Sequence, residues 1–594
     1  MKEKTIRKGS SFFMEETPAA EVFTPEDFSE EHLMLIKTVD SFIRNEIVPN
    51  IDVLEHKDWE LTRKLMLKAG ELGFLGVDIE EEYGGSEMDY IASLLVCEYS
   101  ALSGSFGLAL NDHTGIGSMP LVFFGNKAQK EKYLPSLATG EKLGAYALTE
   151  PGAGTDAMAI QTTAVLSPDG KYYKLSGTKQ YVTNGGFADI IFTYAKIDGD
   201  KMTAFILERD FEGISFGAEE KKMGLRGSST CSIFLDGAKV PVENLVYEIG
   251  RGHIVAFNIL NLGRFKLGAG SVGVAKLAIE SSVGYSKERV QFGKPICQFG
   301  LIKHKIAEMA TKTYMAESMV YRTGGLIDAS FATVDRNAED IGRQSANSIF
   351  EYVVECSINK VYCSEILDYV GDEAVQIYGG YGYCEEYPVE RIYRDNRIFR
   401  IFEGTNEINR LLIIGQLVRK ALKNEIPLLS VAEKVREEMP AMGPLSPASG
   451  DGLLGYQSRL VERAKKIFLF LCGGAAQKYG MALEEEQEIL GLMSDIAQEV
   501  YAMESGLLRA LKSIESSGEQ QSKMKIDMVR LYVNDAMVRV RSYARQILAA
   551  METGEALDSQ LATLRKVSQF TPVNGVQLRR DIADGIIEVG RYLC

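Results

Sequence analysis

One glutamate lies where the sequence could support proton transfer. Glu403 stands between Phe402 and Gly404 in the run Arg400–Glu407. An apolar neighbour favours burial of the carboxylate, and burial raises the pKa of a carboxyl group toward the range of a general base. The same run is also typical of an acid in the first turn of a helix. By itself it leaves both interpretations open.

A glycine-rich segment at 146–156 has the composition of a ligand-binding turn. Gly152 and Gly154 leave backbone amides accessible, and Thr149 and Thr155 add hydroxyl groups that could bind a polar ring or a phosphate. A tight glycine turn with no ligand would have the same composition, so this segment is also open to two interpretations.

A second such segment follows at 181–186. Tyr181 and Thr183 would share one face of a strand, because side chains two residues apart point the same way. The ring could cover a flat ligand while the hydroxyl binds its edge. The flank of an ordinary hairpin is the alternative interpretation.

A third glycine pattern is misleading. Gly268–Gly273 matches GxGxxG, which is typical of dinucleotide binding when a strand precedes it and a helix follows. Residues 254–266 predict a helix instead, and no βαβ unit surrounds them. We therefore reject a Rossmann fold and expect these small residues to let bundle helices approach closely.

The elements that must position these residues change in type along the chain. Residues 28–145 predict a helical domain, preceded by an N-cap at Thr24. Residues 146–251 hold short β-rich runs separated by Asp-Gly and Asn-Gly turns, which predicts a central antiparallel β-domain. Long helical periodicity returns at 252–422 and predicts a helical bundle that carries Glu403.

Three further regions complete the predicted organisation. Residues 1–27 form an N-terminal extension, and 423–454 contain four prolines and predict a linker. Residues 455–594 are again helical and predict an appended all-α domain. The expected fold class is therefore multidomain α+β.

Composition and charge exclude several classes of protein. The chain has 594 residues, 45% of them apolar and 25% charged, which is enough for more than one globular unit. With 66 basic and 82 acidic side chains the net charge is −16, so nucleic acid is not an expected partner. Scattered cysteines and histidines predict no metal site. We expect a cytoplasmic protein, since the sequence has no signal-peptide pattern and no run of about 18 apolar residues.

Together and in this order, the segments resemble the acyl-CoA dehydrogenase family over residues 30–420. Two signature regions carry the resemblance, Ala147–Asp156 and Gln376–Thr405. Further matching segments lie between them, at Lys222–Thr230, Val240–Asn244 and Glu288–Gly293. The appended helical unit is similar to that of the very-long-chain subgroup, a branch that also contains a paralogue known for assembling respiratory complexes.

The resemblance implies an FAD enzyme that forms a trans-2,3 double bond in a fatty acyl-CoA, the first step of fatty-acid β-oxidation. Glu403 matches the family's catalytic base, which takes the α-proton while the β-hydride passes to the flavin. Some relatives carry the base one residue before an arginine, but here Gly263 stands before Arg264. We therefore expect Glu403 to be the base.

The resemblance also assigns residues to the two ligands. The isoalloxazine ring would contact Tyr146, Ala147, Leu148, Thr149, Thr155, Tyr181, Val182 and Thr183. A neighbouring subunit would direct Arg289, Gln291 and Phe292 toward the pyrophosphate. The adenosine would contact Gln376, Gly379 and Gly380, and the phosphates or ribose Thr405 and Glu407. The acyl-CoA path would be lined by Thr155, Asn261, Arg264, Phe402 and Gly404.

The expected partners follow from the same resemblance. They are a fatty acyl-CoA, an electron-transfer flavoprotein and further copies of the chain in a homodimer or homotetramer. The appended helical unit favours long-chain substrates. Glycines in 105–117 would leave room for a long tail, although small residues also permit close helix crossing. Two basic and five acidic side chains give 425–455 a net charge of −3, which argues against stable attachment to an anionic membrane.

Two alternative functions stay open on the sequence. An acyl-CoA oxidase would use the same flavin site but pass electrons to O2, and such enzymes usually carry a larger C-terminal half. An assembly scaffold would keep the fold with a vestigial site. Retention of Glu403, Arg289 and the Thr149–Asp156 loop favours the dehydrogenase.

Overall fold

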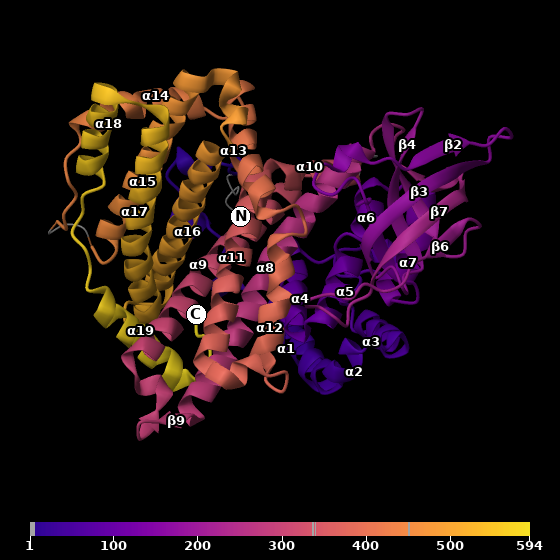
Figure 1. Cartoon of the computed structure of the whole chain (residues 1–594), viewed down its shortest axis with the longest axis horizontal. Helices are drawn as coiled ribbons and strands as arrows, with labels where there is room; N and C mark the ends of the chain where they lie inside the picture. The colour runs from indigo at the N-terminus through magenta and orange to yellow at the C-terminus, as the bar shows by residue number, and fades with distance from the viewer. Residues whose placement is uncertain (1–5, 336–337, 339, 449–451) are drawn as a thin grey trace.

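The computed structural model describes residues 6–335, 338, 340–448 and 452–594. Long helices form a bundle in the middle of the molecule (Figure 1). The C-terminal helices pack on one side of this bundle, and the N-terminal helices and the sheet lie on the other. Within the described ranges, no helix combines the length and apolar content needed to cross a bilayer.

The N-terminal helices begin at side-chain caps. The Ser29 side chain accepts a hydrogen bond from the His32 N–H and starts α1, and Asp89 caps α4 in the same way. The N-cap predicted at Thr24 starts only the 3-10 turn Pro25–Asp27, because Phe28 leaves helical geometry and Ser29 then caps the chain again. The helices are α1 Glu30–Phe42, α2 Ile51–Glu55, α3 Trp59–Glu71, α4 Tyr90–Ser100, α5 Ser105–Thr114, α6 Met119–Phe124 and α7 Lys127–Thr139.

The β-domain is an eight-stranded sheet in the order β6-β7-β3-β2-β4-β5-β8, with β1 paired to β4. Most neighbouring strands are antiparallel, as predicted, but β1 and β2 run parallel to β4, so the sheet is mixed. The turn at 184–186 does not close a hairpin, because it carries the chain from β3 past β2 to β4. The strands are β1 Gly144–Ala147, β2 Thr163–Leu166, β3 Tyr172–Thr183, β4 Ile190–Ile197, β5 Lys201–Glu208, β6 Ile214–Phe216, β7 Thr230–Pro241 and β8 Leu245–Val246.

The bundle is built around one long helix, α8, which crosses several others closely. A Cβ on Gly268 would lie 3.2 Å from Val320 of α9, and one on Gly273 would lie 2.0 Å from the Glu98 carbonyl oxygen of α4. The GxGxxG pattern therefore serves helix crossing inside a helix, which confirms the rejection of a Rossmann fold. The elements are α8 Gly252–Glu288, β9 Val290–Gln291, β10 Lys294–Pro295, α9 Gly300–Phe331, α10 Ile341–Glu351, α11 Val353–Tyr378, α12 Pro388–Asn396 and α13 Asn406–Leu422.

The segment predicted as a linker, 423–454, contains a packed helix. Helix α14, Leu428–Glu438, starts directly after Pro427 and buries Leu428, Ala432 and Val435, which share one helical face. It packs on the first of the appended helices. These are α15 Gly455–Tyr479, α16 Gln487–Ser517, α17 Lys523–Met551, α18 Gly554–Val567 and α19 Gly575–Val589.

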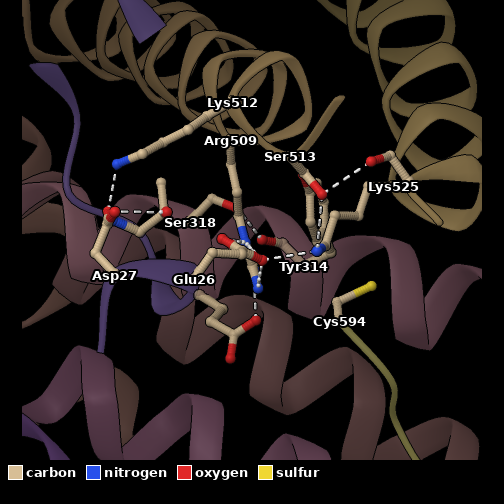
Figure 2. A network of polar contacts seen from close by, with 12 residues as sticks. Glu26, Asp27, Tyr314, Ser318, Arg509, Lys512, Ser513, Lys525 and Cys594 are labelled. Atoms are coloured by element: carbon tan, nitrogen blue, oxygen red, sulfur yellow. Dashed lines mark hydrogen bonds and ion pairs between the residues drawn. The ribbon is translucent and has the colours of Figure 1, made fainter. Parts of the chain in front are cut away.

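Charged side chains join the bundle to the C-terminal helices and the N-terminal segment (Figure 2). The Arg509 guanidinium of α16 is fully buried and lies 2.9 Å from Glu26 and 2.6 Å from Glu317 of α9. Lys525 of α17 lies 2.8 Å from the same Glu26 carboxylate. Lys512 of α16 forms an ion pair with Asp27, the residue that follows Glu26.

From residue 6 on, the N-terminal extension is an integral part of the fold. Besides the ion pairs of Glu26, Phe13 is buried and stacks on Phe468 of α15, with ring centroids 4.3 Å apart. Phe12 packs on Tyr501 of α16. The N-terminal segment thus fastens the appended helices to the bundle.

Candidate functional site

Glu403 lies on a tight turn just before helix α13. Its φ is +59° and that of Gly404 is +79°, so two consecutive residues adopt left-handed geometry, which is uncommon for a glutamate. The turn directs the side chain to α8. A Cβ built on Gly263 would lie 2.5 Å from Glu403 Oε2, so the carboxyl group rests directly on the backbone of Gly263.

Polar side chains hold the backbone of this turn. Arg264 Nε donates to the Glu403 carbonyl oxygen at 3.1 Å. Asn409 Nδ2 of α13 donates to the carbonyl oxygens of Gly404 at 2.8 Å and Thr405 at 3.0 Å. Strain at functional residues persists only where the surroundings fix it, and these contacts do so.

The Glu403 carboxyl group has the properties of a general base. Burial raises its pKa to about 7, although the charges of Arg264 and Lys360 act to lower it. Its Oε2 is buried and has no hydrogen-bond partner among the described residues. A carboxylate that titrates near neutrality and has a free lone pair can accept a proton from a ligand.

Two charged residues near Glu403 were missed by the sequence analysis. Lys360 of α11 is fully buried and donates to Asn406 Oδ1 at 2.6 Å, and burial lowers its pKa to about 7. Asp112 of α5 is also buried, and burial together with the charge of Glu403 holds its pKa well above the usual range. The sequence gives one sign of these two residues, which is that each is an ionisable residue within a mostly apolar helical segment.

Of the predicted ring-binding residues of the β-domain, Tyr146 lies near this turn. Tyr146 of β1 is buried, and burial, followed by Tyr194 and the charge of Glu403, raises its pKa, which places its side chain in the neighbourhood of the Glu403 carboxyl. Leu148, Thr149 and Thr155 follow in the adjoining loop. Tyr181 projects from a bulge in β3 with φ +58° and a largely exposed ring, next to the buried Val182 and the half-buried Thr183.

The surroundings fit a polar, planar ligand. No atom lies within 4 Å of a Cβ built on Gly152 or Gly154, so the loop faces open space. On the α8 side, Asn261 Nδ2 is buried without a hydrogen-bond partner among the described residues, as is Glu403 Oε2. Such groups are costly to leave unpaired, and a bound ligand would satisfy them.

The glycines of 105–117 do not widen a cavity. A Cβ on Gly107 would lie 2.4 Å from the Ser100 carbonyl oxygen, and one on Gly117 would lie 2.9 Å from the Gly144 carbonyl carbon. These glycines allow close backbone approach, which was the alternative interpretation, and they do not support the expected room for a long tail.

A second group of predicted cofactor residues lies at the far end of α8. Arg289, Gln291, Gly379 and Gly380 line a groove of about 560 Å³ together with Tyr285 and Tyr378. Phe292, at φ +52°, is 94% exposed at the tip of the β9–β10 hairpin. Gln376 is exposed near the end of α11.

The two groups do not meet within one chain. Arg264 and Arg289 are separated by 25 residues of continuous helix and its C-cap, which corresponds to roughly 37 Å at 1.5 Å per residue. The structure therefore brings Tyr146, Asn261, Arg264 and Glu403 together, and leaves Arg289, Gln291, Phe292 and Gly380 elsewhere.

The remaining predicted residues surround the Glu403 turn. Phe402 and Gly404 flank Glu403, and the Thr405 side chain caps α13 by accepting from Ile408 N–H. Glu407 is exposed in the first turn of α13, where its own backbone N–H lowers its pKa. The described residues contain no group of three or more His, Cys, Asp or Glu side chains suited to a metal ion.

The order of domains and the fold belong to a known class of enzymes. Family models of the acyl-CoA dehydrogenase N-terminal, middle and C-terminal domains match residues 29–141, 145–238 and 250–418, and a further C-terminal domain model of the family matches 463–566. The chain belongs to the acyl-CoA dehydrogenase family of oxidoreductases.

Individual relatives extend the likeness over the whole chain. A probable acyl-CoA dehydrogenase of Bacillus subtilis is 50% identical over 589 residues, which cover 99% of this chain and 98% of the relative. The human mitochondrial very long-chain specific acyl-CoA dehydrogenase is 36% identical, covering 83% of this chain and 75% of its own. A crystal structure of a Bacillus anthracis acyl-CoA dehydrogenase complexed with FAD superimposes with a TM-score of 0.97 at 50% identity, over 99% of this chain and 100% of that one.

Proposed function

We propose that this protein is an FAD-dependent dehydrogenase that introduces a trans-2,3 double bond into fatty acyl-CoA, with Glu403 as the catalytic base. The observation that carries the proposal is the Glu403 carboxyl group. It is buried against Gly263, has a pKa of about 7, and leaves Oε2 free to accept a proton. Membership of the family supports the reaction class.

In this mechanism the chain's own residues remove the α-proton and position the group that accepts it. Glu403 Oε2 removes it from the carbon next to the thioester, while Arg264 and Asn409 keep the turn in place. The Glu403 backbone N–H would donate to the thioester oxygen, where one well-placed donor contributes about 3–4 kcal/mol to the transition state. Bound FAD would supply the acceptor for the hydride that leaves Cβ.

The residues that would hold FAD fall into two groups, and this supports a homo-oligomer. Tyr146 lies near the Glu403 carboxyl, and we assign Thr149, Thr155 and Tyr181, which belong to the loop after β1 and to the β3 bulge, to the ring system of the same chain. The Arg289 groove lies roughly 37 Å along α8 from Arg264, so these residues would serve the cofactor of another copy. An arginine there could pair with a pyrophosphate.

Long-chain substrates and an electron-transfer flavoprotein as the acceptor complete the proposal. Likeness to a human enzyme described as very long-chain specific supports the chain length, because the likeness includes part of the appended helical domain. Glycine positions in 105–117 add no support, since backbone atoms fill the space beside Gly107 and Gly117.

Anaerobic titration with acyl-CoA tests this function. The purified protein should contain FAD, and its flavin absorbance should bleach with thioesters, most efficiently with long chains in a series from butyryl to eicosanoyl. Glu403→Gln should bind FAD and thioester but bleach far more slowly. Rapid reoxidation of the reduced enzyme in air would identify an oxidase instead. A protein that neither binds FAD nor responds to acyl-CoA would favour the scaffold.

A further inference from the structure

A buried ion pair fixes the loop that follows β1. Lys179 of β3 lies 2.7 Å from Glu150 of the loop, and the two side chains are 0% and 5% exposed. Removing both charges from water is unfavourable unless good geometry and additional hydrogen bonds offset it. The partners of the two side chains therefore indicate what the pair holds in place.

On the lysine side, two consecutive residues of β3 form hydrogen bonds with three consecutive residues of the loop. Lys179 Nζ donates to the Leu148 carbonyl oxygen at 3.4 Å as well as to Glu150. The next residue, Gln180, donates its backbone N–H to the Thr149 carbonyl oxygen at 2.8 Å. Lys179 is anchored in turn by the Tyr194 carbonyl oxygen of β4 at 2.7 Å.

On the glutamate side, the carboxylate connects the start of the segment between β1 and β2 with the end of that segment. Glu150 Oε2 accepts from the Gln161 N–H at 2.5 Å, and Oε1 accepts from the Thr162 N–H at 3.1 Å and from the Thr162 hydroxyl. The backbones of Glu150 and Ala153 also bind each other through both N–H groups, at 3.0 and 3.1 Å. The glycine turn is thus closed at its base.

The same two β3 residues lead directly into the bulge that carries Tyr181. Pairing of β3 with β7 is interrupted between Lys179 and Val182, and Tyr181 adopts φ +58° there. A bulge re-aims the side chain it carries. The position of the glycine turn relative to the Tyr181 ring is therefore set at Lys179.

We propose that Lys179 and Glu150 are positioning residues that hold the 148–155 loop and the Tyr181 ring at a fixed separation for the flavin. The inference rests on the proposed function, since that function assigns both surfaces to FAD. Neither side chain touches the cofactor in this proposal. They act through the backbone of Leu148 and Thr149 and through the bulge.

The experiment compares Lys179→Met with a matched variant elsewhere. Lys465 of α15 and Glu504 of α16 form a second buried pair, 2.5 Å apart with side chains 4% and 5% exposed, in the C-terminal helices. Lys465→Met therefore removes one buried cation far along the chain, at a carboxylate that Arg322 still pairs with at 2.9 Å. The double variant Lys179→Met/Glu150→Gln removes both charges from the loop pair and keeps an amide oxygen that can accept from Thr162.

FAD binding and amide exchange are measured on all four proteins, wild type included, and Tm is recorded for each as a measure of stability. FAD affinity and the visible flavin spectrum report the holoenzyme, and amide hydrogen exchange of residues 148–155 reports the cofactor-free protein. Lys179→Met should weaken FAD binding by about tenfold or more and speed exchange in the loop, whereas Lys465→Met should lower Tm with little change in either. The double variant should regain Tm relative to Lys179→Met, because no carboxylate is left unpaired, without regaining FAD affinity.

The inference would be overturned if both loop variants kept the wild-type FAD affinity, flavin spectrum and amide exchange rates. It would also be overturned if the double variant regained FAD binding together with Tm. If Lys179→Met does not fold, the double variant and Glu150→Gln decide the question by the same two measurements. Failure of the wild-type protein to bind FAD would refute the proposed function instead, and loop exchange would still decide whether the pair holds the loop.

Discussion

At the scale of single residues, the proposed role of Glu403 predicts how the reaction depends on pH. Only its ionised form can accept the α-proton, and burial raises its pKa to about 7. The rate of flavin reduction by acyl-CoA should therefore rise with pH, pass its midpoint near pH 7 and level off above. Stopped-flow absorbance measures this rate, and Glu403→Gln should lower the plateau by about 10²–10⁴-fold.

Asp112→Asn is the matched control for this titration. Burial and the charge of Glu403 raise the pKa of Asp112 well above its usual range and favour the neutral carboxyl, so an amide in its place should leave the midpoint unchanged. A midpoint that moved by a full pH unit in Asp112→Asn would assign the titration to the coupled pair.

The same shift predicts how Glu403 affects stability. Its pKa is about 7 in the folded protein and 4.5 for the ordinary group, so the folded state binds the proton more tightly. The contribution is favourable while the carboxyl is protonated and is lost as pH rises from 4.5 through 7. Glu403→Gln should therefore be more stable than the wild type at pH 8 by about 2–3 kcal/mol, and similar to it at pH 4.5. Urea unfolding at the two pH values measures both differences, and equal stability at pH 8 would contradict the assigned shift.

At the scale of elements, α8 supplies the surface on which the base rests. An alanine Cβ at position 263 would lie 2.5 Å from Glu403 Oε2, so Gly263→Ala must displace the carboxyl group. We expect a loss of turnover of about tenfold or more, because small misplacements of a reacting group are costly, while FAD content is kept. Steady-state assays and the flavin spectrum measure the two effects.

Gly284→Ala on the same helix provides the comparison. No atom lies within 4 Å of a Cβ there, so the substitution should keep full activity and add up to about 1 kcal/mol of stability through helix propensity. Equal activity in the two variants would show that the Glu403 carboxyl does not depend on the Gly263 surface.

Much of the element order could be predicted from the sequence, because caps, turns and periodicity are local. The short β-rich runs predicted within 146–251 are strands such as β3 and β5 in the structure. Glu403 is singled out in the sequence by its apolar neighbour and by its match to the family's base, and that role stays a prediction. The direction of neighbouring strands could not be predicted from local sequence, because β1 pairs with β4 and three connections separate them along the chain. The approach of Asp112 and Lys360 to Glu403 could not be predicted either, because each comes from a different helix and only packing brings them together.

At the scale of the whole molecule, Arg509 links three parts of the chain. Its fully buried guanidinium binds Glu26 of the N-terminal segment and Glu317 of the bundle from the C-terminal helix α16 (Figure 2). Arg509→Met leaves two carboxylates without this cation, and we expect a loss of about 3–5 kcal/mol in the free energy of unfolding. Calorimetry measures the loss. Lys201→Met, which removes an exposed pair with Asp198, should cost under about 1 kcal/mol, and a similar loss in both variants would contradict this role for Arg509.

The N-terminal segment shows why contacts between distant parts of the chain cannot be predicted from the sequence. The sequence predicts residues 1–27 as an extension, and the structure describes them from residue 6 on. Their stability in the fold comes from Phe13 against Phe468 and Glu26 against Arg509, partners that are more than 450 residues away.

The length of α8 has a genetic consequence. If each copy contributes its Arg289 end to its neighbour's flavin site, a missing base on one copy and a missing arginine on the other fall in the same pocket, and the second pocket keeps both groups. Co-expressing Glu403→Gln chains with Arg289→Ala chains would then yield hybrid dimers in which one pocket has both groups intact. Two inactive alleles would complement each other in the same cell, whereas mixing the separately purified, non-exchanging proteins would restore nothing.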